Sequence, residues 1–94
     1  MTSSRLPLRE IAVFEAVSRL GSFKAAAREL NLTPSAVSHQ IRSLEHDLGV
    51  DLFIRDGRRA RLSTAATDYA GQVHELLMGL RTATNKVAVR GRLR

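Results

Sequence analysis

Residues 22–49 carry the sequence SFKAAARELNLTPSAVSHQIRSLEHDLG, and this segment decides the fold of the chain. Apolar residues recur in it at spacings of three and four over two separate stretches, as on one face of an α-helix. Asn31 lies between the stretches, and Asn adopts the left-handed backbone conformation more readily than most residues. The segment therefore predicts two short helices joined by a tight turn, which is the arrangement of a helix-turn-helix.

Residues that suit a helix terminus occur at the expected ends of both helices. Ser22 precedes the first helix and can accept a hydrogen bond from a free backbone N–H. Thr33 and Pro34 suit the N-cap and the first helical position of the second helix, where the missing proline N–H costs little. Gly49 is expected to end that helix. The inward faces are expected to hold Phe23, Ala26, Ala27 and Leu30, then Val37, Ile41, Leu44 and Leu48.

The second helix carries a polar face opposite its apolar one. By the same spacing rule, five polar residues share this outward face: Ser35, Ser38, His39, Arg42 and His46. No acidic residue occurs from Thr33 to Leu44, so the positive N-terminal end of the helix stays available to a phosphate. The pattern favours a helix that enters the major groove of DNA. The alternative is a surface helix whose small polar residues are simply solvated.

A basic element follows in residues 52–62, LFIRDGRRARL. The pair Asp56-Gly57 lies between two segments with apolar ends and predicts a hairpin, or wing. Residues 55–61 hold four arginines and one acid, a formal charge of +3; the arginines are Arg55, Arg58, Arg59 and Arg61. Arginines near a hairpin tip suit phosphate contact or a narrow minor groove. The alternative is a solvated edge hairpin whose charges discourage pairing with other strands.

Two further helices are expected, one on each side of this region. The first runs from about Pro7 to Leu20, faces the core with Ile11, Phe14 and Val17, and ends at Gly21. The second is long, follows the wing and is capped by Ser63 or Thr64. Along it, apolar residues alternate at spacings of three and four: Ala66, Tyr69, Val73, Leu76, Leu80, Ala83 and Val87.

The long helix has the heptad pattern of a coiled coil, sustained for three repeats. We therefore expect a homodimer through this linker helix. The expected interface residues are Tyr69, Val73, Leu76, Leu80 and Ala83. The alternative is one amphipathic helix packed onto its own domain.

Composition agrees with a small domain that binds a polyanion. The 94 residues make one domain, and 15 basic against 9 acidic residues give a net charge of +6. No cysteine is present, no apolar run approaches membrane-spanning length, and the N-terminus does not resemble a signal peptide. We therefore expect a cytoplasmic protein with no membrane partner.

Catalysis is not expected. The three histidines, His39, His46 and His74, have no cysteine partners and no tight carboxylate cluster around them. His39 and His46 are seven residues apart on one face, too far for a shared metal. No glycine loop suited to a phosphate occurs, and the few aromatic residues offer no stacking platform for unpaired bases. We expect no enzyme, no metal and no cofactor.

Several motifs occur in one order from about Leu6 to Val87: SF-x-x-AA-x-x-L, T-x-x-x-VS-x-QI-x-x-LE, LG-x-x-LF-x-R, and L-S/T-x-A before a long helix. This order resembles the N-terminal domain of LysR-type bacterial transcriptional regulators. The resemblance implies a mainly α winged helix-turn-helix, three helices plus a two-stranded wing, followed by a long linker helix that dimerises. It also implies that Arg55 contacts the DNA backbone. The second helix of the helix-turn-helix, the recognition helix, is implied to contact bases and phosphates through residues near its start: Pro34, Ser35, Ser38, His39 and Arg42.

Two positions depart from the family pattern. Many members carry Gln where this chain has Pro34, and Arg where it has His39. Gln can bond adenine bidentately and Arg can bond guanine, whereas Pro can do neither and a neutral His donates a single bond. The base preferences of relatives therefore do not carry over to these two positions.

The resulting hypothesis is a homodimeric bacterial transcription regulator that binds double-stranded DNA at an interrupted palindromic operator. We expect a DNA-binding domain at 6–63, a dimerising linker helix at 64–88 and a basic tail at 89–94. The chain is expected to be an excised fragment whose small-molecule inducer binds only a full-length form. The residues expected to contact DNA are Ser22, Lys24, Thr33, Pro34, Ser35, Ser38, His39, Arg42, Arg55, Arg58 and Arg59.

Two rival functions remain open at this point. In one, the heptad helix binds a foreign protein and the basic wing only solubilises the surface. In the other, the domain packages DNA without sequence preference. Gel shifts at two salt concentrations, with and without a specific site, distinguish the three possibilities.

Overall fold

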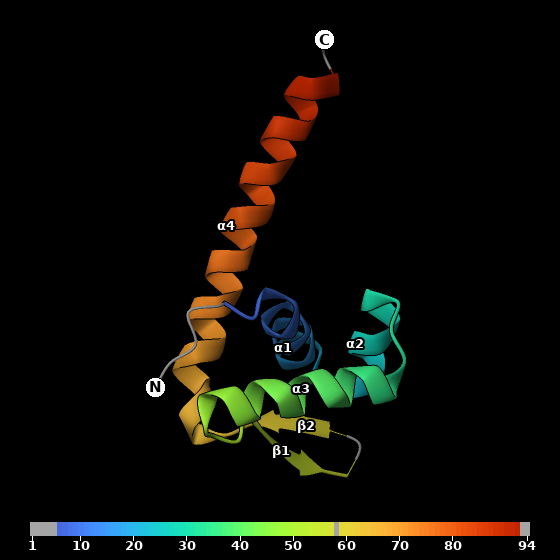
Figure 1. Ribbon diagram of the computed structural model, residues 1–94, viewed down its shortest axis with the longest axis vertical. Coiled ribbons are helices and arrows are strands. Elements are labelled where there is room, and N and C mark those ends of the chain that lie inside the picture. The colour runs from blue at the N-terminus through green and yellow to red at the C-terminus, as the bar shows by residue number, and fades with distance from the viewer. Residues whose placement is uncertain (1–5, 58, 93–94) are drawn as a thin grey trace.

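The computed structural model describes residues 6–57 and 59–92, and most of these residues are helical (Figure 1). Strands β1 and β2 form an antiparallel hairpin beside the helices, and a single 3₁₀ turn, η1, leads into the last helix. The predicted fold class, a winged helix-turn-helix followed by a long linker helix, is confirmed. The elements are α1 (Leu8–Leu20), α2 (Phe23–Leu30), α3 (Pro34–Leu48), β1 (Phe53–Asp56), β2 (Arg59–Leu62), η1 (Thr64–Ala66) and α4 (Thr67–Arg92).

Local capping sets the turn between α2 and α3. The Ser22 hydroxyl accepts a hydrogen bond from the Ala25 N–H at 3.0 Å, as expected of an N-cap. Asn31 takes the left-handed conformation, with φ of 58°, and ends α2. This allows the Leu32 N–H to donate a hydrogen bond to the Ala27 carbonyl at 2.9 Å, so this carbonyl at the end of the helix keeps a hydrogen-bond partner as the chain turns away.

The ends of α3 also follow the predicted pattern. Thr33 is the N-cap, its hydroxyl accepts the Ala36 N–H at 3.0 Å, and Pro34 is the first helical residue. Gly49 ends the helix in the left-handed conformation, with φ of 72°, and donates its N–H to the Glu45 carbonyl at 2.8 Å. The recognition helix is therefore fixed at both ends by its own sequence.

The core lies between α1, α2, α3 and the foot of α4. Phe14, Val17, Val37 and Leu44 are completely buried there. All four aromatic side chains of the chain meet: the ring of Phe14 lies 5.5 Å from that of Phe53 and 5.2 Å from that of Tyr69, and the ring of Phe23 lies 5.7 Å from that of Phe53. This cluster joins the first helix, the helix-turn-helix, the wing and α4 in one core.

The wing is a short hairpin whose register fixes the direction of its arginines. Phe53 pairs with Leu62, and Arg55 pairs with Ala60. Successive side chains of a strand point to opposite faces, so Arg55 shares the inner face of the hairpin with buried Phe53. The turn differs by one residue from the expected Asp56-Gly57: Asp56 still pairs in the ladder, and Gly57, with φ of 62°, opens the loop.

Ser63 joins the wing to the long helix. Its hydroxyl donates to the Asp51 carbonyl at 2.6 Å and accepts the Ala66 N–H at 3.2 Å. On the other side of this joint, the Glu45 carboxylate accepts the Leu52 N–H at 2.8 Å. These bonds hold α3, the start of β1 and η1 together.

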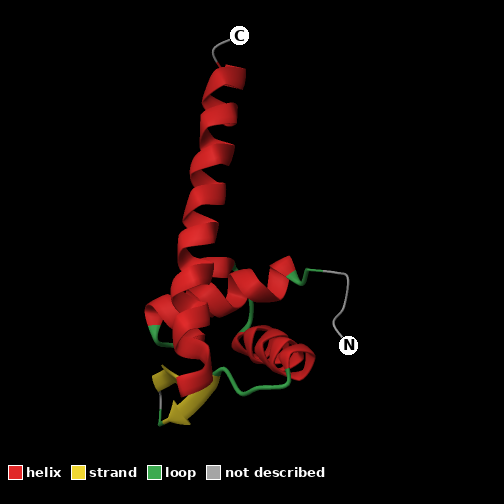
Figure 2. Cartoon of the chain, turned by 90° about the vertical axis from the view of Figure 1, so that its left-hand side faces the viewer, coloured by secondary structure: helices red, strands yellow, loops and turns green. Residues whose placement is uncertain are grey.

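The first turns of α4 pack onto their own domain, and the rest of the helix projects beyond it (Figure 2). Val73 is 6% exposed, and Tyr69 is half-buried against Phe14. Tyr69 and Val73, which were expected in the dimer interface, therefore contact the core of their own domain. The same three-and-four spacing serves core packing in these turns, because periodicity identifies a face and not what covers it.

A buried carboxylate also attaches α4 to α1. Glu15 is 2% exposed; its Oε2 atom lies 2.7 Å from His74 Nδ1 and accepts Arg19 Nε at 3.0 Å. Arg19 extends the network to Glu29 of α2, with Nη1 bonded to Oε1 at 3.0 Å. Burial raises the pKa of Glu15, but the hydrogen bonds and charges of Arg19 and His74 outweigh it and hold that pKa below its ordinary value.

Helix α4 is longer than expected. It continues to Arg92, so the boundary expected at residue 88 falls inside the helix, and the basic segment from 89 to 92 is helical. The last part of the expected tail, 93–94, lies outside the described residues. Across 6–57 and 59–92, no helix combines the length and apolar character needed to cross a membrane.

Candidate nucleic-acid interface

The N-terminal half of α3 lies open to solvent on its polar side. Thr33, Pro34, Ser35, His39 and Arg42 are exposed, and Ser38 is half-buried. The first turn of α3 contains no acidic residue, so its free N–H groups and positive dipole end face outward unopposed. The structure thus gives this face the orientation that contact with a polyanion needs.

The N-terminus of α2 and the wing enclose a basic hollow. Its wall contains four cationic side chains and no carboxylate, and four of the residues expected to contact DNA meet there: Ser22, Lys24, Arg55 and Arg59. The complete lining is Ser22, Phe23, Lys24, Arg28, Arg55, Gly57 and Arg59. Backbone N–H groups at the start of a helix, surrounded by cations, form a suitable site for a phosphate.

Arg55 bridges the wing and the helix-turn-helix. Its Nη2 donates to the Ser38 hydroxyl at 3.0 Å, and its guanidinium carbon lies 4.2 Å from the centre of the Phe23 ring. Both contacts follow from the strand register, which directs Arg55 toward the helices. Two residues that the sequence suggested as separate DNA contacts are therefore bonded to each other.

The remaining wing arginines are arranged differently. Arg59 and Arg61 are exposed, and Arg61 Nε lies 3.9 Å from an Asp56 carboxylate oxygen. The pair is solvated and contributes little to stability. Arg58, which was expected to contact DNA, lies outside the described residues.

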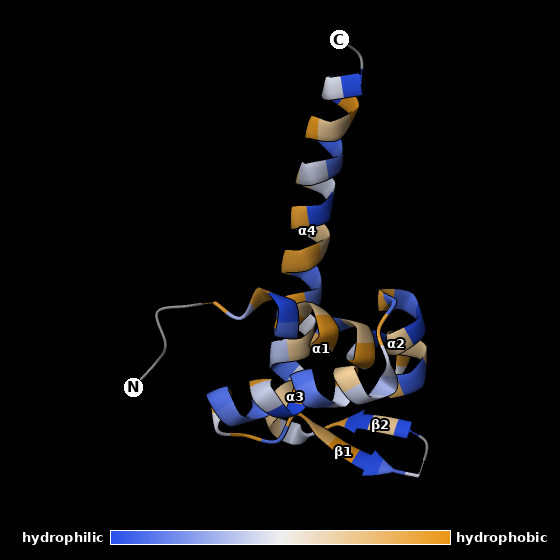
Figure 3. Ribbon diagram, turned by 45° about the vertical axis from the view of Figure 1, so that its right-hand side comes forward, coloured by the Kyte–Doolittle hydropathy of each residue, from blue (hydrophilic) through white to orange (hydrophobic). Residues whose placement is uncertain are grey.

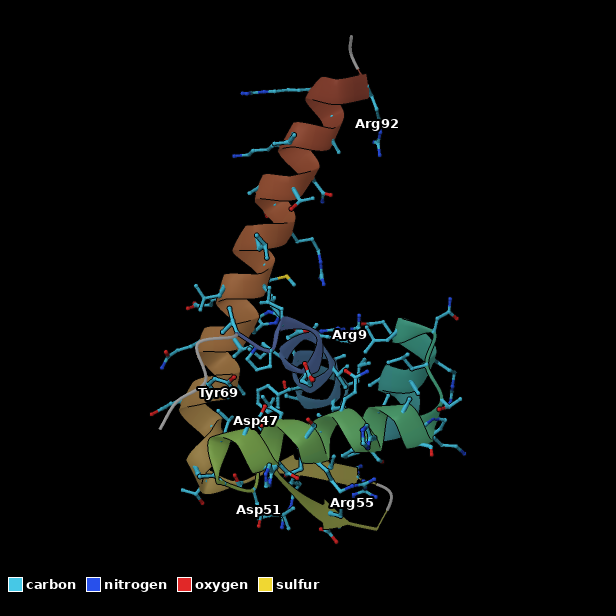
Figure 4. All side chains as sticks on the ribbon, viewed as in Figure 1. Arg9, Asp47, Asp51, Arg55, Tyr69 and Arg92 are labelled. Carbon is cyan, nitrogen blue, oxygen red and sulfur yellow. The ribbon has the colours of Figure 1, made fainter. Side chains whose placement is uncertain are left out.

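Acidic residues gather at the opposite end of α3. Figure 4 shows Asp47 and Asp51 by the C-terminal end of the helix, with Arg55 further toward the wing tip. Glu45, also in this half, has its carboxylate bonded to the N–H groups of Leu52 and Phe53. The basic and acidic groups are thus separated along α3, and a polyanion is attracted to the N-terminal half.

Sequence reasoning missed two residues of this surface. Arg28 lines the basic hollow, and its spacing of four from Lys24 on one helix could have revealed it. Phe23 was assigned to the core alone, yet its ring also supports the Arg55 guanidinium. No signal in the sequence indicates this second contact, because it depends on how the wing folds back.

A second candidate surface runs along the outer part of α4. Leu76, Leu80 and Val87 are 73%, 56% and 70% exposed, and Ala83 is also exposed. Spacings of four, three and four place these residues on one face of the helix. In Figure 3 apolar segments recur among hydrophilic ones along this helix. The stripe Leu76, Leu80, Ala83 and Val87 is called the α4 stripe below.

The histidines occupy two kinds of environment. His39 and His46 are exposed on α3, and His74 lies against Glu15. Within the described part of the chain, no three side chains of His, Cys, Asp or Glu are placed to hold a metal ion. His74 therefore has a structural partner, the buried carboxylate of Glu15.

Comparison with known proteins agrees with this geometry. Residues 8–67 match the family profile of the bacterial regulatory helix-turn-helix proteins of the lysR family. The chain is 46% identical over 81 residues to the uncharacterized HTH-type transcriptional regulator y4mQ of Sinorhizobium fredii (strain NBRC 101917 / NGR234), and 44% identical over 89 residues to the glycine cleavage system transcriptional activator of Escherichia coli (strain K12). These alignments cover 86% and 94% of this chain.

A solved structure, of the complex between the CbnR DNA-binding domain and DNA, is also similar. It superimposes with a TM-score of 0.72 at 28% sequence identity, and the match covers 92% of this chain and 97% of that one. In contrast, the chain spans only 27% and 29% of the lengths of the two curated relatives.

Proposed function

Because this chain belongs to the LysR family of bacterial regulatory helix-turn-helix proteins, we propose that it binds double-stranded DNA in a sequence-specific manner to regulate transcription. One observation carries the proposal: the acid-free, exposed face of α3 lies directly beside the basic hollow of α2 and the wing. The similar CbnR domain forms a complex with DNA. The regulatory family also agrees with the expectation that the protein is not an enzyme.

The proposed contacts divide into two classes. Ser35, Ser38, His39 and Arg42 on α3 face base edges in the major groove, where donors and acceptors distinguish the base pairs. Thr33 and Pro34, at the start of the helix, approach the adjoining phosphates.

The basic hollow forms the second class. Ser22, Lys24, Arg55 and Arg59 hold the phosphate backbone, with Arg58 of the wing tip as a further proposed contact. These contacts position the protein and do not themselves select a sequence.

We further propose that two copies associate through the α4 stripe. An apolar stripe on a helix that projects beyond its domain is suited to a coiled-coil partner. Two-fold pairing would present two recognition helices to an interrupted palindromic operator. Because the chain spans under a third of these relatives, a small-molecule inducer enters the proposal only for a longer form.

The two classes of contact predict different salt behaviour. Arg59→Ala should weaken binding to all duplexes alike and flatten the dependence of log K on log salt concentration by about 0.9, the value of one phosphate contact. His39→Ala should instead change the ratio of affinities between duplexes and leave the slope nearly unchanged. Fluorescence anisotropy titrations at several salt concentrations measure both quantities. Identical behaviour of the two variants would contradict the proposed division.

A further inference from the structure

Arg55 and Ser38 form a pair that crosses from the wing to the recognition helix. The Nη2 of Arg55 donates to the Ser38 hydroxyl at 3.0 Å while the guanidinium lies over the Phe23 ring. Together with Arg42, both side chains line a small cleft between α3 and β1. The guanidinium thus lies against the Phe23 ring, which fixes its plane, and donates one hydrogen bond to the Ser38 hydroxyl.

This bond determines what the Ser38 hydroxyl can offer to a ligand. A serine hydroxyl has one hydrogen to donate and two lone pairs that accept. Arg55 can only donate, so it occupies a lone pair, and its positive charge repels a second donor from the same oxygen. The hydroxyl hydrogen is left free, and Ser38 therefore faces solvent as a hydrogen-bond donor.

On DNA, a donor selects among base edges. Guanine offers the acceptors O6 and N7 in the major groove, thymine offers O4 and adenine offers N7, whereas the amino groups of cytosine and adenine are themselves donors. A hydroxyl free to rotate would accept either kind of partner. A hydroxyl that already accepts a hydrogen bond from Arg55 favours acceptor groups on the base edges over amino groups.

We propose that Arg55 is a positioning residue that sets the Ser38 hydroxyl as a donor and thereby determines base preference at the base pair that Ser38 contacts. The inference rests on the proposed DNA-binding function and assigns Arg55 a specificity role in addition to phosphate contact. In this respect Arg55 differs from Arg59, which makes no hydrogen bond to α3 within the described part of the chain.

Selection of bound duplexes from a random pool tests the inference with the 94-residue chain. Ser38→Ala should lose the preference for an acceptor base at one base pair. Arg55→Met should lose the same preference at the same base pair, by roughly 3- to 10-fold, the size of one hydrogen bond. The double variant should select the same motif as Ser38→Ala alone, because the two residues act through one hydroxyl.

Two matched variants separate this role from charge and from folding. Arg59→Met also removes one wing charge; it should weaken binding to all sequences and leave the selected motif unchanged. Phe23→Leu retains every charge but removes the ring that orients the guanidinium. It should keep the salt slope and weaken the preference at the Ser38 base pair. Thermal melting confirms that each variant is folded.

Two results would overturn the inference. In one, Arg55→Met selects the motif of the unmodified chain. In the other, it changes a base pair different from the one that Ser38→Ala changes. A separate result, in which the unmodified chain enriches no motif from the pool, would remove the DNA-binding proposal itself and this inference with it.

Discussion

At the scale of the residue, Glu15 has the environment that is hardest to obtain from a sequence. A charged carboxylate in a protein core is costly unless it is paired and hydrogen-bonded. Both oxygens of Glu15 are bonded, Oε2 to Arg19 and His74 and Oε1 to Arg19 at 3.3 Å. An ionised carboxylate only accepts hydrogen bonds, so His74 must carry the Nδ1 hydrogen. Glu15 therefore fixes both the position and the tautomer of a residue on α4.

The variant Glu15→Gln should destabilise the domain by about 2 kcal/mol at neutral pH. The side-chain NH₂ of glutamine would face the N–H donors of Arg19 or His74, and one hydrogen bond would be lost. The lowered pKa of Glu15 means that its carboxylate stabilises the fold above its ordinary value of 4.5, and that this stabilisation is lost as the pH falls through the lowered folded value. The difference between the two proteins should therefore shrink below pH 4.5. Urea unfolding across this range measures it.

A destabilisation by Glu15→Gln that stays constant from neutral to acidic pH would contradict this account. Glu10→Gln is the matched control, since it removes a carboxylate from the same helix, near its N-terminus. No bond from Glu10 to Arg19 or His74 occurs in the described structure. It should leave the acid dependence nearly unchanged.

At the scale of the element, each helix of the helix-turn-helix is defined by its ends. Ser22 and Thr33 cap the starts of α2 and α3, while Asn31 and Gly49 allow the chain to leave them in the left-handed conformation. The angle between the two helices depends on the turn at Asn31. This turn therefore sets how far the recognition face projects beyond α2.

Substitutions at Asn31 test this turn directly. Asn31→Val should destabilise the domain by about 1–2 kcal/mol, because a β-branched side chain clashes with the backbone at a φ of 58°. Asn31→Gly should be near neutral or slightly stabilising, because glycine adopts this conformation freely. Chemical denaturation of both variants gives the comparison. Equal stabilities of the Val and Gly variants would show that the turn is not constrained.

The long helix provides a second test at this scale. Leu80→Asp places a charge in the centre of the α4 stripe and should convert a dimer to a monomer without lowering the melting temperature of the DNA-binding domain. Thr82→Asp introduces the same charge two residues away, on the other side of the helix, and should leave the dimer intact. Light scattering at micromolar concentration measures the mass. An unmodified chain that is strictly monomeric would contradict the proposed pairing.

The sequence predicted what local chemistry determines. Caps, left-handed residues and apolar faces of α1 to α3 follow from neighbours within a turn or two, and most of them were predicted. Leu48 is the exception: it was expected on the inward face of α3 but is 44% exposed. Contacts that join distant segments were not predicted: Glu15 and His74 are 59 residues apart, and Arg55 and Ser38 are 17 apart. The core contacts of Tyr69 and Val73 were not predicted for the same reason, because spacing along α4 does not reveal that α1 covers its first turns.

At the scale of the whole molecule, shape and charge act together. The domain and its projecting helix extend over 49 × 33 × 21 Å, with the wing and the end of α4 far apart (Figure 1). The net charge of +6 attracts any polyanion, and the acid-free face of α3 gives that attraction a direction. In a dimer, α4 would set the separation of two recognition helices, about 34 Å for successive major-groove faces.

The central claim is that the exposed face of α3 selects a DNA sequence and does not merely adhere to DNA. The most direct measurement is the ratio of dissociation constants for a duplex chosen from a random pool and for a scrambled duplex of equal composition, at one fixed salt concentration. The ratio should be on the order of 1,000 or more, and it should fall markedly in a Ser35→Ala, His39→Ala double variant. Equal affinities for the two duplexes, or a ratio unchanged by that double variant, would contradict the claim.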